Sequence, residues 1–166
     1  MTKNFIKYIK YICSSYPKKD DLSKARLNKI LYLADWKSAV DSGKTISDVN
    51  WIYNHYGPYV KEIKDALSQN SDFDIKATHN YYGQNKEIIT LKNNSQIEDI
   101  EENNKKIIDE IINKTSDMRF NEFIDLVYST YPVLTQPQGS HLKLKNLAKT
   151  YTALIENKKN SSEITT

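Results

Sequence analysis

The sequence predicts an α+β fold that is predominantly helical, with about six helices around one central helix and a small antiparallel β element. Apolar residues recur every three or four positions over most of the 166 residues, which is the period of amphipathic helices. Between residues 73 and 92 the period shortens to two, which indicates paired strands. Strands are expected at about residues 49–55, 73–79 and 86–92, arranged as a β-hairpin or as a three-stranded sheet.

The first helix is predicted over residues 3–15. Its apolar face consists of Phe5, Ile6, Ile9 and Ile12. Lysines interrupt this face, so neither a signal segment nor a membrane-spanning segment is expected. Cys13 also lies on this face and is interpreted as a buried, inert thiol. Because it is the single cysteine, no internal disulfide can form, and we expect a cytoplasmic protein.

The central helix is predicted at residues 22–42, with Asp20 and Asp21 at its N-terminus and Gly43 as its C-terminal stop. Its apolar side chains form two ridges on opposite sides. One ridge contains Leu27, Ile30, Leu31 and Ala34, and the other contains Leu33, Trp36 and Val40. A helix that is apolar on two sides is usually buried at the centre of a domain.

After the central helix, the sequence predicts an extended segment up to residue 56. Gly57 and Pro58 are then expected to begin a helix that ends near residue 67. The alternating segment that follows has turn residues at positions 82–85, which favours a β-hairpin.

Three helices are predicted in the second half of the chain. Ser95 and Glu98 form a capping-box pattern for the first, which is expected to end near residue 114. Asp117 is expected to cap the second, and Tyr131 with Pro132 to end it. The inward-facing residues of this second helix are predicted to be Phe120, Phe123, Ile124, Val127 and Tyr128. The last helix begins near Leu144.

The domain organisation follows from the length and the periodicity. A chain of this size is most simply one domain, which we assign to residues 1–156. Residues 157–166 have no apolar periodicity and are expected to form a disordered tail.

These elements resemble the Panacea domain, the SocA-like antitoxin family. The resemblance rests on residues 29–36, which read Lys-Ile-Leu-Tyr-Leu-Ala-Asp-Trp, on the Gly43 turn, and on residues 56–60, which read Tyr-Gly-Pro-Tyr-Val. It implies an α-rich domain with a small β element, which protects a cell from a cognate protein toxin by binding it directly. The toxin is expected to be encoded next to this chain.

The motif residues that carry the resemblance are interpreted as mainly structural. They are Leu27, Ile30, Leu31, Tyr32, Leu33, Ala34, Gly57 and Pro58. They supply packing and a backbone turn, so recognition of a partner is expected elsewhere.

Catalytic chemistry is not indicated by the sequence. His55, His79 and His141 occur in three different elements without metal-ligand spacing, so no metal site is expected. No phosphate loop or nucleophile motif is present, so no cofactor and no enzymatic activity are expected. Two other functions stay open as alternatives, a nucleic-acid-binding transcriptional regulator and a small enzyme of unrecognised chemistry. The net charge of +3 makes nucleic acid the less favoured partner.

The partner-binding surface is predicted from the aromatic side chains. Tyrosine and tryptophan dominate binding hot spots, and they gather at the extended stretch and at the hairpin tip. The candidate residues are Trp51, Tyr53, His55, Tyr56, Tyr59, Tyr81 and Tyr82. The loop at residues 134–142 is a second candidate, because long ordered loops often carry function.

Overall fold

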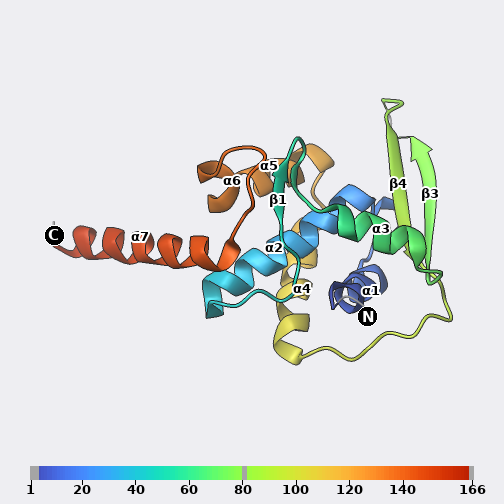
Figure 1. Cartoon of the computed structure of the whole chain (residues 1–166), viewed down its shortest axis with the longest axis horizontal. Coiled ribbons are helices and arrows are strands. Elements are labelled where there is room, and N and C mark those ends of the chain that lie inside the picture. The colour runs from blue at the N-terminus through green and yellow to red at the C-terminus, as the bar shows by residue number, and fades with distance from the viewer. Residues whose placement is uncertain (1–3, 80–81, 165–166) are drawn as a thin grey trace.

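The structure is a computed structural model that describes residues 4–79 and 82–164. Within these ranges it contains seven α-helices and two separate two-stranded sheets (Figure 1). The helices are α1 (Phe5–Ser15), α2 (Lys24–Ser42), α3 (Lys61–Gln69), α4 (Glu102–Thr115), α5 (Phe120–Tyr128), α6 (Tyr131–Thr135) and α7 (Leu144–Ile164). The strands are β1 (Ile52–Asn54), β2 (Gly57–Tyr59), β3 (Phe73–His79) and β4 (Asn85–Leu91). The predicted α+β, predominantly helical class is confirmed.

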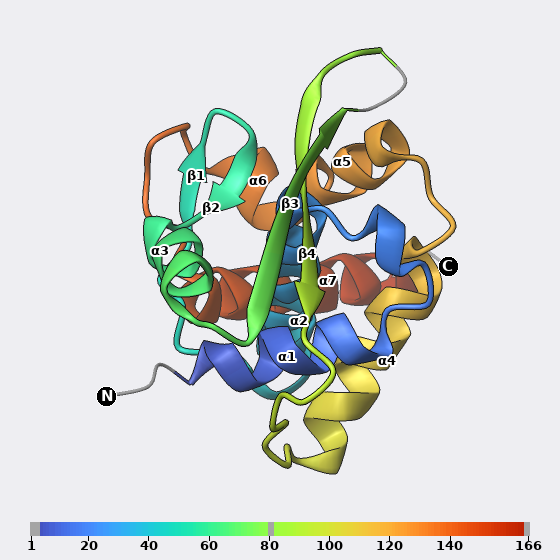
Figure 2. The ribbon, with the colours of Figure 1, turned by 90° about the vertical axis from the view of Figure 1, so that its right-hand side faces the viewer.

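Helix α2 lies at the centre of the fold, as predicted. It contacts α1, α4, α5, α7, β2 and β4. Figure 2 shows α1 and the β3–β4 hairpin in front of α2, with α7 behind it. A helix on the surface of a domain needs only one apolar side, whereas α2 is covered from several directions, which explains why its sequence is apolar on two sides.

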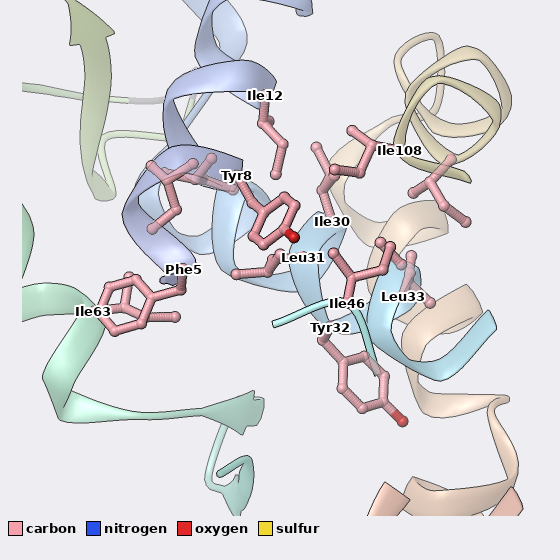
Figure 3. Close-up of a cluster of buried hydrophobic side chains, with 14 of the residues drawn as sticks. Phe5, Tyr8, Ile12, Ile30, Leu31, Tyr32, Leu33, Ile46, Ile63 and Ile108 are labelled. Carbon is pink, nitrogen blue, oxygen red and sulfur yellow. The ribbon is translucent and has the colours of Figure 1, made fainter. Parts of the chain in front are cut away.

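The core forms around α2. The six apolar motif residues, Leu27, Ile30, Leu31, Tyr32, Leu33 and Ala34, are all buried. Figure 3 shows Tyr8 and Ile12 of α1 and Ile108 of α4 directed toward Ile30 and Leu31 from different elements. Helix α2 therefore supplies the surface on which the N-terminal and C-terminal helices pack.

The residue predicted to end α2 is confirmed, but the residues predicted to cap its beginning are not. Gly43 has φ +78° and follows the last turn, so the predicted glycine stop is confirmed. At the other end, Ser23 is the N-cap and its hydroxyl accepts a 3.1 Å hydrogen bond from the Arg26 amide. Asp20 and Asp21 lie in a preceding 3₁₀ turn, Lys19–Asp21, so the prediction that they cap the helix is wrong.

The two hairpins do not form one sheet. Strand β1 pairs with β2, and β3 pairs with β4, so the hairpin alternative is confirmed and the three-stranded arrangement is wrong. The physical reason is that residues 57–59 are extended rather than helical. After a short turn they form the antiparallel partner strand of β1. Helix α3 consequently begins at Lys61, after the strand, and not at the Gly57-Pro58 pair.

The second half of the chain differs from the prediction at three helix boundaries. Ser95 bonds to the carbonyl oxygen of Asp72, so it does not cap a helix, and α4 begins only at Glu102. Arg119 rather than Asp117 occupies the N-cap position of helix α5, without a side-chain capping hydrogen bond, and the Asp117 carboxylate pairs with a lysine of the N-terminal segment. Residues 131–135 form a separate helix, α6, which accommodates Pro132 in its first turn.

The inward face predicted for α5 is partly wrong, because Phe120 at its first position is 48% exposed, whereas Phe123 and Val127 are fully buried. Helix α7 continues to Ile164, so most of the segment expected to be a disordered tail is helical. Its C-terminal half extends beyond the other elements in Figure 1.

Gly57 allows a backbone conformation that other residues avoid, since its φ is +97°. A Cβ at this position would lie 3.6 Å from Cε of Lys29 and 3.9 Å from the ring of Tyr128. We expect Gly57→Val to lower the free energy of unfolding by about 2–4 kcal/mol, from backbone strain and from the added bulk. Chemical denaturation of the purified variant measures this change.

The matched control for that substitution is Gly139→Val. Gly139 has a similar φ of +92°, but a Cβ added there would meet nothing within 4 Å. The control therefore isolates the strain, and it is expected to cost less than Gly57→Val. Equal costs for the two variants would contradict a packing role for Gly57.

Candidate functional site

Trp51 is buried, although it was predicted to belong to the partner-binding surface. Its side chain is 1% exposed, and its indole N–H donates a 2.9 Å hydrogen bond to Oδ2 of Asp35. Its ring also packs edge-on against Tyr32, with 5.7 Å between ring centroids. Trp51 therefore fastens the extended segment to α2 and is not available to a partner in this structure.

Asp35 organises the segment that leads to β1. Its carboxylate accepts hydrogen bonds from the amides of Ile46 and Ser47, from the Ser47 hydroxyl and from Trp51. Burial raises the pKa of Asp35 to about 6, although these four donors favour the charged form. The carboxylate thus replaces the backbone partners that residues 46 and 47 lack.

The β1–β2 hairpin, residues 52–59, carries four of the other predicted aromatic and imidazole residues. Tyr56 is 82% exposed at the turn, and His55 beside it is also exposed. Tyr53 and Tyr59 are half-buried, and the ring of Tyr53 packs against Tyr128 of α5 at 6.2 Å. The hairpin therefore presents one exposed tyrosine, Tyr56, between two half-buried ones, Tyr53 and Tyr59.

The second candidate loop lies directly against this hairpin. The amide of Tyr53 donates to the carbonyl of Ser140 at 2.9 Å, and the amide of Leu142 donates to the carbonyl of Trp51 at 2.8 Å. The Gln138 side chain lies 2.8 Å from Nδ1 of His55. Residues 139–142 thus occupy the free edge of β1. The two regions that were predicted separately form one continuous face.

Of the two remaining predicted residues, the structure describes Tyr82, which belongs to the other hairpin. Tyr82 is 84% exposed near the β3–β4 turn, and Tyr81 lies outside the described residues. In Figure 2 this hairpin and the β1–β2 hairpin stand apart, with their turns at separate places. The structure therefore does not gather the predicted aromatic set into a single cluster.

A cavity of about 640 Å³ opens beside the β1–β2 hairpin. Its walls come from the N-terminal half of α2, the beginning of β4, helix α5 and the hairpin itself. Aromatic side chains from two of these elements line it, namely Tyr56, Tyr59, Phe120 and Tyr128. The volume lies within the range of small-ligand sites in proteins.

Two buried polar side chains of α2 line this cavity without partners. Lys29 is 3% exposed and makes no hydrogen bond or ion pair with any residue in the described ranges. Asn28 is 2% exposed, and its Oδ1 atom also has no hydrogen-bond partner there. Burial lowers the pKa of Lys29 to about 8. Among the described residues, the buried side-chain atoms without a hydrogen-bond partner are Oδ1 of Asn28 and the hydroxyl of Tyr16, which does not line the cavity. Because buried polar groups are normally paired, the unpaired Lys29 next to Asn28 makes this cavity the candidate site.

Arg26 has a different role on the same helix. Its guanidinium donates to the carbonyls of Thr115 and Met118 at 3.0 and 2.9 Å, and it lies 4.8 Å from the centroid of the Phe123 ring. These contacts hold the end of α4 and the beginning of α5 against α2. The guanidinium of Arg26 is thus occupied by contacts that stabilise the fold, whereas the ammonium of Lys29 makes no such contact among the described residues.

The charges around the cavity are predominantly positive. Five cationic residues and two anionic residues line it among the described residues: Lys24, Arg26, Lys29, Lys86 and Arg119 against Asp21 and Glu87. Both carboxylates already pair with lysines, Glu87 with Lys24 at 3.1 Å and Asp21 with Lys86 at 3.9 Å. Arg119 is exposed and pairs with Glu122 at 3.9 Å, so the cations without a carboxylate partner are the two buried ones, Arg26 and Lys29.

Other candidate chemistry finds no support in the described part of the chain. No group of three or more His, Cys, Asp or Glu side chains there is placed to hold a metal ion. Burial raises the pKa of Cys13 to about 12, so the thiol is not activated. None of the helices in those same ranges is long and apolar enough to cross a membrane.

Sequence reasoning did not single out Lys29, Asn28 or Asp35 as site residues. Their position in the sequence was the one feature that could have indicated them. Polar residues within a helix that is apolar on two sides are buried together with that helix. The carboxylate of Asp35 accepts hydrogen bonds from four donors. The ammonium group of Lys29 and the Oδ1 atom of Asn28 have no partner among the described residues. Only the structure distinguishes these two outcomes.

Comparison with known proteins identifies a family. A family model described as Antitoxin SocA-like, Panacea domain, matches residues 27–132. No curated protein and no solved structure gives a significant match. The matched range contains most of α2, both hairpins and helices α3 to α5, and therefore every residue that lines the cavity from Asn28 onward.

Proposed function

This chain belongs to the SocA-like antitoxin family of Panacea domains, and we propose that it neutralises a cognate protein toxin by binding it directly. The observation that carries the proposal is the family match across the central helix and both hairpins. Neutralisation by a complex requires no catalytic group on this chain, only a surface that fits the toxin.

The face that we propose for the toxin consists of the β1–β2 hairpin and residues 134–142. Exposed aromatic and apolar side chains lie on it, since Tyr56 is 82% and Leu134 is 69% exposed. The hydrogen bonds between residues 139–142 and β1 make this face rigid. A preorganised aromatic surface binds with a smaller loss of conformational entropy than a mobile one.

A co-expression experiment tests the proposed function. A neighbouring reading frame is expected to arrest growth when expressed alone and to be harmless when this chain is expressed with it. The two proteins are then expected to copurify at a fixed stoichiometry. A toxic neighbour that stays toxic in the presence of the folded chain would contradict the proposal.

Tyr56→Ala tests the proposed face. Because Tyr56 is exposed, the substitution is expected to leave the melting temperature nearly unchanged and to weaken the toxin complex about 30-fold, as loss of a hot-spot side chain does. Calorimetric titration with the copurified toxin measures the affinity.

The matched control for this measurement is Tyr82→Ala, which removes an equally exposed tyrosine from the β3–β4 hairpin. It is expected to retain wild-type affinity. The reverse pattern, with Tyr82→Ala weakening the complex and Tyr56→Ala neutral, would move the interface to the β3–β4 hairpin.

A further inference from the structure

The cavity beside the β1–β2 hairpin contains a buried cation without a counter-ion among the described residues. Lys29 lies on α2, and its Cε is close to Gly57 of β2, so the ammonium group sits between the helix and the hairpin. No carboxylate of the described residues lies within ion-pair distance of it. Buried charges in proteins are almost always paired, and an anion from outside the chain would complete this one.

We propose that this cavity receives an acidic side chain, aspartate or glutamate, of the toxin, and that Lys29 is its counter-ion. This inference rests on the proposed function, because the toxin is taken as the source of the acidic residue. The antitoxin family match assigns no ligand to the cavity.

A single carboxylate fits the cavity better than a phosphate group does. Phosphate carries more negative charge and is usually held by several donors, such as arginine forks. Here the guanidinium of Arg26 is used by two carbonyls, and two carboxylates, Asp21 and Glu87, stand in the cavity wall. Lys24 and Lys86 pair with these carboxylates, so Lys29 provides one unpaired ammonium, which balances the single charge of one carboxylate.

The other groups in the cavity suit a peptide. Asn28 also lines the cavity, and its carboxamide, whose buried Oδ1 atom has no partner, is the kind of group that bonds a backbone N–H next to an acidic residue once the side chain turns toward the ligand. The rings of Tyr59 and Phe120 offer apolar contact to the residues that flank it. At about 640 Å³, the cavity is larger than one carboxylate side chain and accommodates such neighbours.

The position of the cavity connects it to the toxin-binding face. Tyr56 and Tyr59 belong to the β1–β2 hairpin and also line the cavity. A toxin that covers the hairpin therefore passes over the cavity opening. An acidic side chain inserted there would be shielded from water, where its attraction to Lys29 is strongest.

Peptide binding to the full chain tests the inference without a toxin. The probes are acetyl-Leu-Glu-Tyr-amide and its glutamine counterpart, and the readout is the NMR signal of the Lys29 side chain. The glutamate peptide is expected to bind saturably and at least about tenfold more tightly than the glutamine peptide, the difference typical of one charge-assisted hydrogen bond. Binding is also expected to raise the pKa of Lys29.

Two variants accompany this titration. Lys29→Met is expected to lose the preference for glutamate over glutamine, whereas Lys37→Met, on the same helix and outside the cavity, is expected to keep it. Tighter binding of inorganic phosphate or adenosine monophosphate than of the glutamate peptide would overturn the inference. Absence of saturable peptide binding to the folded wild type would also overturn it.

The toxin complex provides the second arm and separates the inference from the proposed function. Lys29→Met is expected to weaken the complex by about 30-fold or more, the usual consequence of removing one member of a buried charge pair. If Tyr56→Ala weakens the complex and Lys29→Met does not, the inference fails and the proposed function stands. If no neighbouring protein is neutralised, the proposed function fails, and with it the toxin as the source of the acidic residue.

Discussion

Replacement of Asp35 by alanine is expected to lower the free energy of unfolding by at least about 3 kcal/mol. The carboxylate is fully buried and accepts four hydrogen bonds from the segment that follows α2. Alanine removes all four acceptor contacts at once and cannot admit enough water to replace them. Urea denaturation followed by tryptophan fluorescence measures the change.

The size of this effect follows from what remains after the substitution. The amides of Ile46 and Ser47 and the indole N–H of Trp51 would stay buried without an acceptor, and each such group costs about 1–3 kcal/mol. Removal of a buried charge offsets part of this cost, because burial already raises the pKa of Asp35. The cost of leaving three buried donors without an acceptor is larger than the gain from removing one buried charge, so the substitution is expected to lower the stability.

Asp41→Ala is the matched control on the same helix. Its carboxylate is 53% exposed and forms a surface ion pair with Lys37 at 3.3 Å, so its loss is expected to change stability by less than about 1 kcal/mol. Asp35→Asn retains one acceptor oxygen and is expected to fall between the two. A change below about 1 kcal/mol for Asp35→Ala would show that the segment before β1 is held by packing alone.

The helical framework could be predicted because its signals are local. The apolar period of residues 27–40 and the glycine at position 43 are properties of neighbouring residues, and both agree with the structure. The capping residues were less predictable. Ser95 has the pattern of a helix cap, but its hydroxyl bonds to a carbonyl 23 positions away. A competing tertiary contact of this kind cannot be recognised in a short window of sequence.

The pairing of β3 with β4 was predicted from alternation and a turn signal, but the pairing of β1 could not be predicted, for a similar reason. Alternation identifies the extended segment around Tyr53 but does not identify its neighbour. One edge of β1 pairs with residues 57–59, and the other contacts residues 139–142 from the far end of the chain. These contacts place residues 139–142 beside the hairpin and leave Tyr56 exposed at its turn, whereas Trp51 is buried by its contacts with Asp35 and Tyr32.

Lys29→Met is expected to stabilise the free protein at pH 7 by about 3 kcal/mol, which is the opposite of most substitutions in a core. Burial lowers the pKa of Lys29 from its usual 10.5 to about 8, so the folded state disfavours the charged form. The resulting loss of stability is complete below pH 8 and disappears above pH 10.5. Methionine keeps the apolar length of the side chain and carries no charge, so it avoids this loss.

The pH dependence identifies Lys29 as the cause. The advantage of the methionine variant is expected to shrink as the pH rises from 7 and to reach about half or less near pH 9.5. Burial raises the pKa of the neighbouring Tyr128, so this phenol stays neutral in that window. The other titratable and charged groups of the cavity are common to both proteins: Asp21, Lys24, Arg26, Tyr56, Tyr59, Lys86, Glu87 and Arg119.

Urea denaturation of both proteins at several pH values between about 7 and 9.5 provides the measurement. Lys37→Met is the control, because Lys37 is solvent-accessible and pairs with Asp41 and Glu110. Its loss is expected to lower stability by less than about 1 kcal/mol at every pH in the series. A Lys29→Met variant that is less stable than the wild type at pH 7 would mean that the ammonium group contributes to the fold itself. A more stable variant that no longer binds the glutamate peptide would identify Lys29 as a residue kept for binding at the expense of stability.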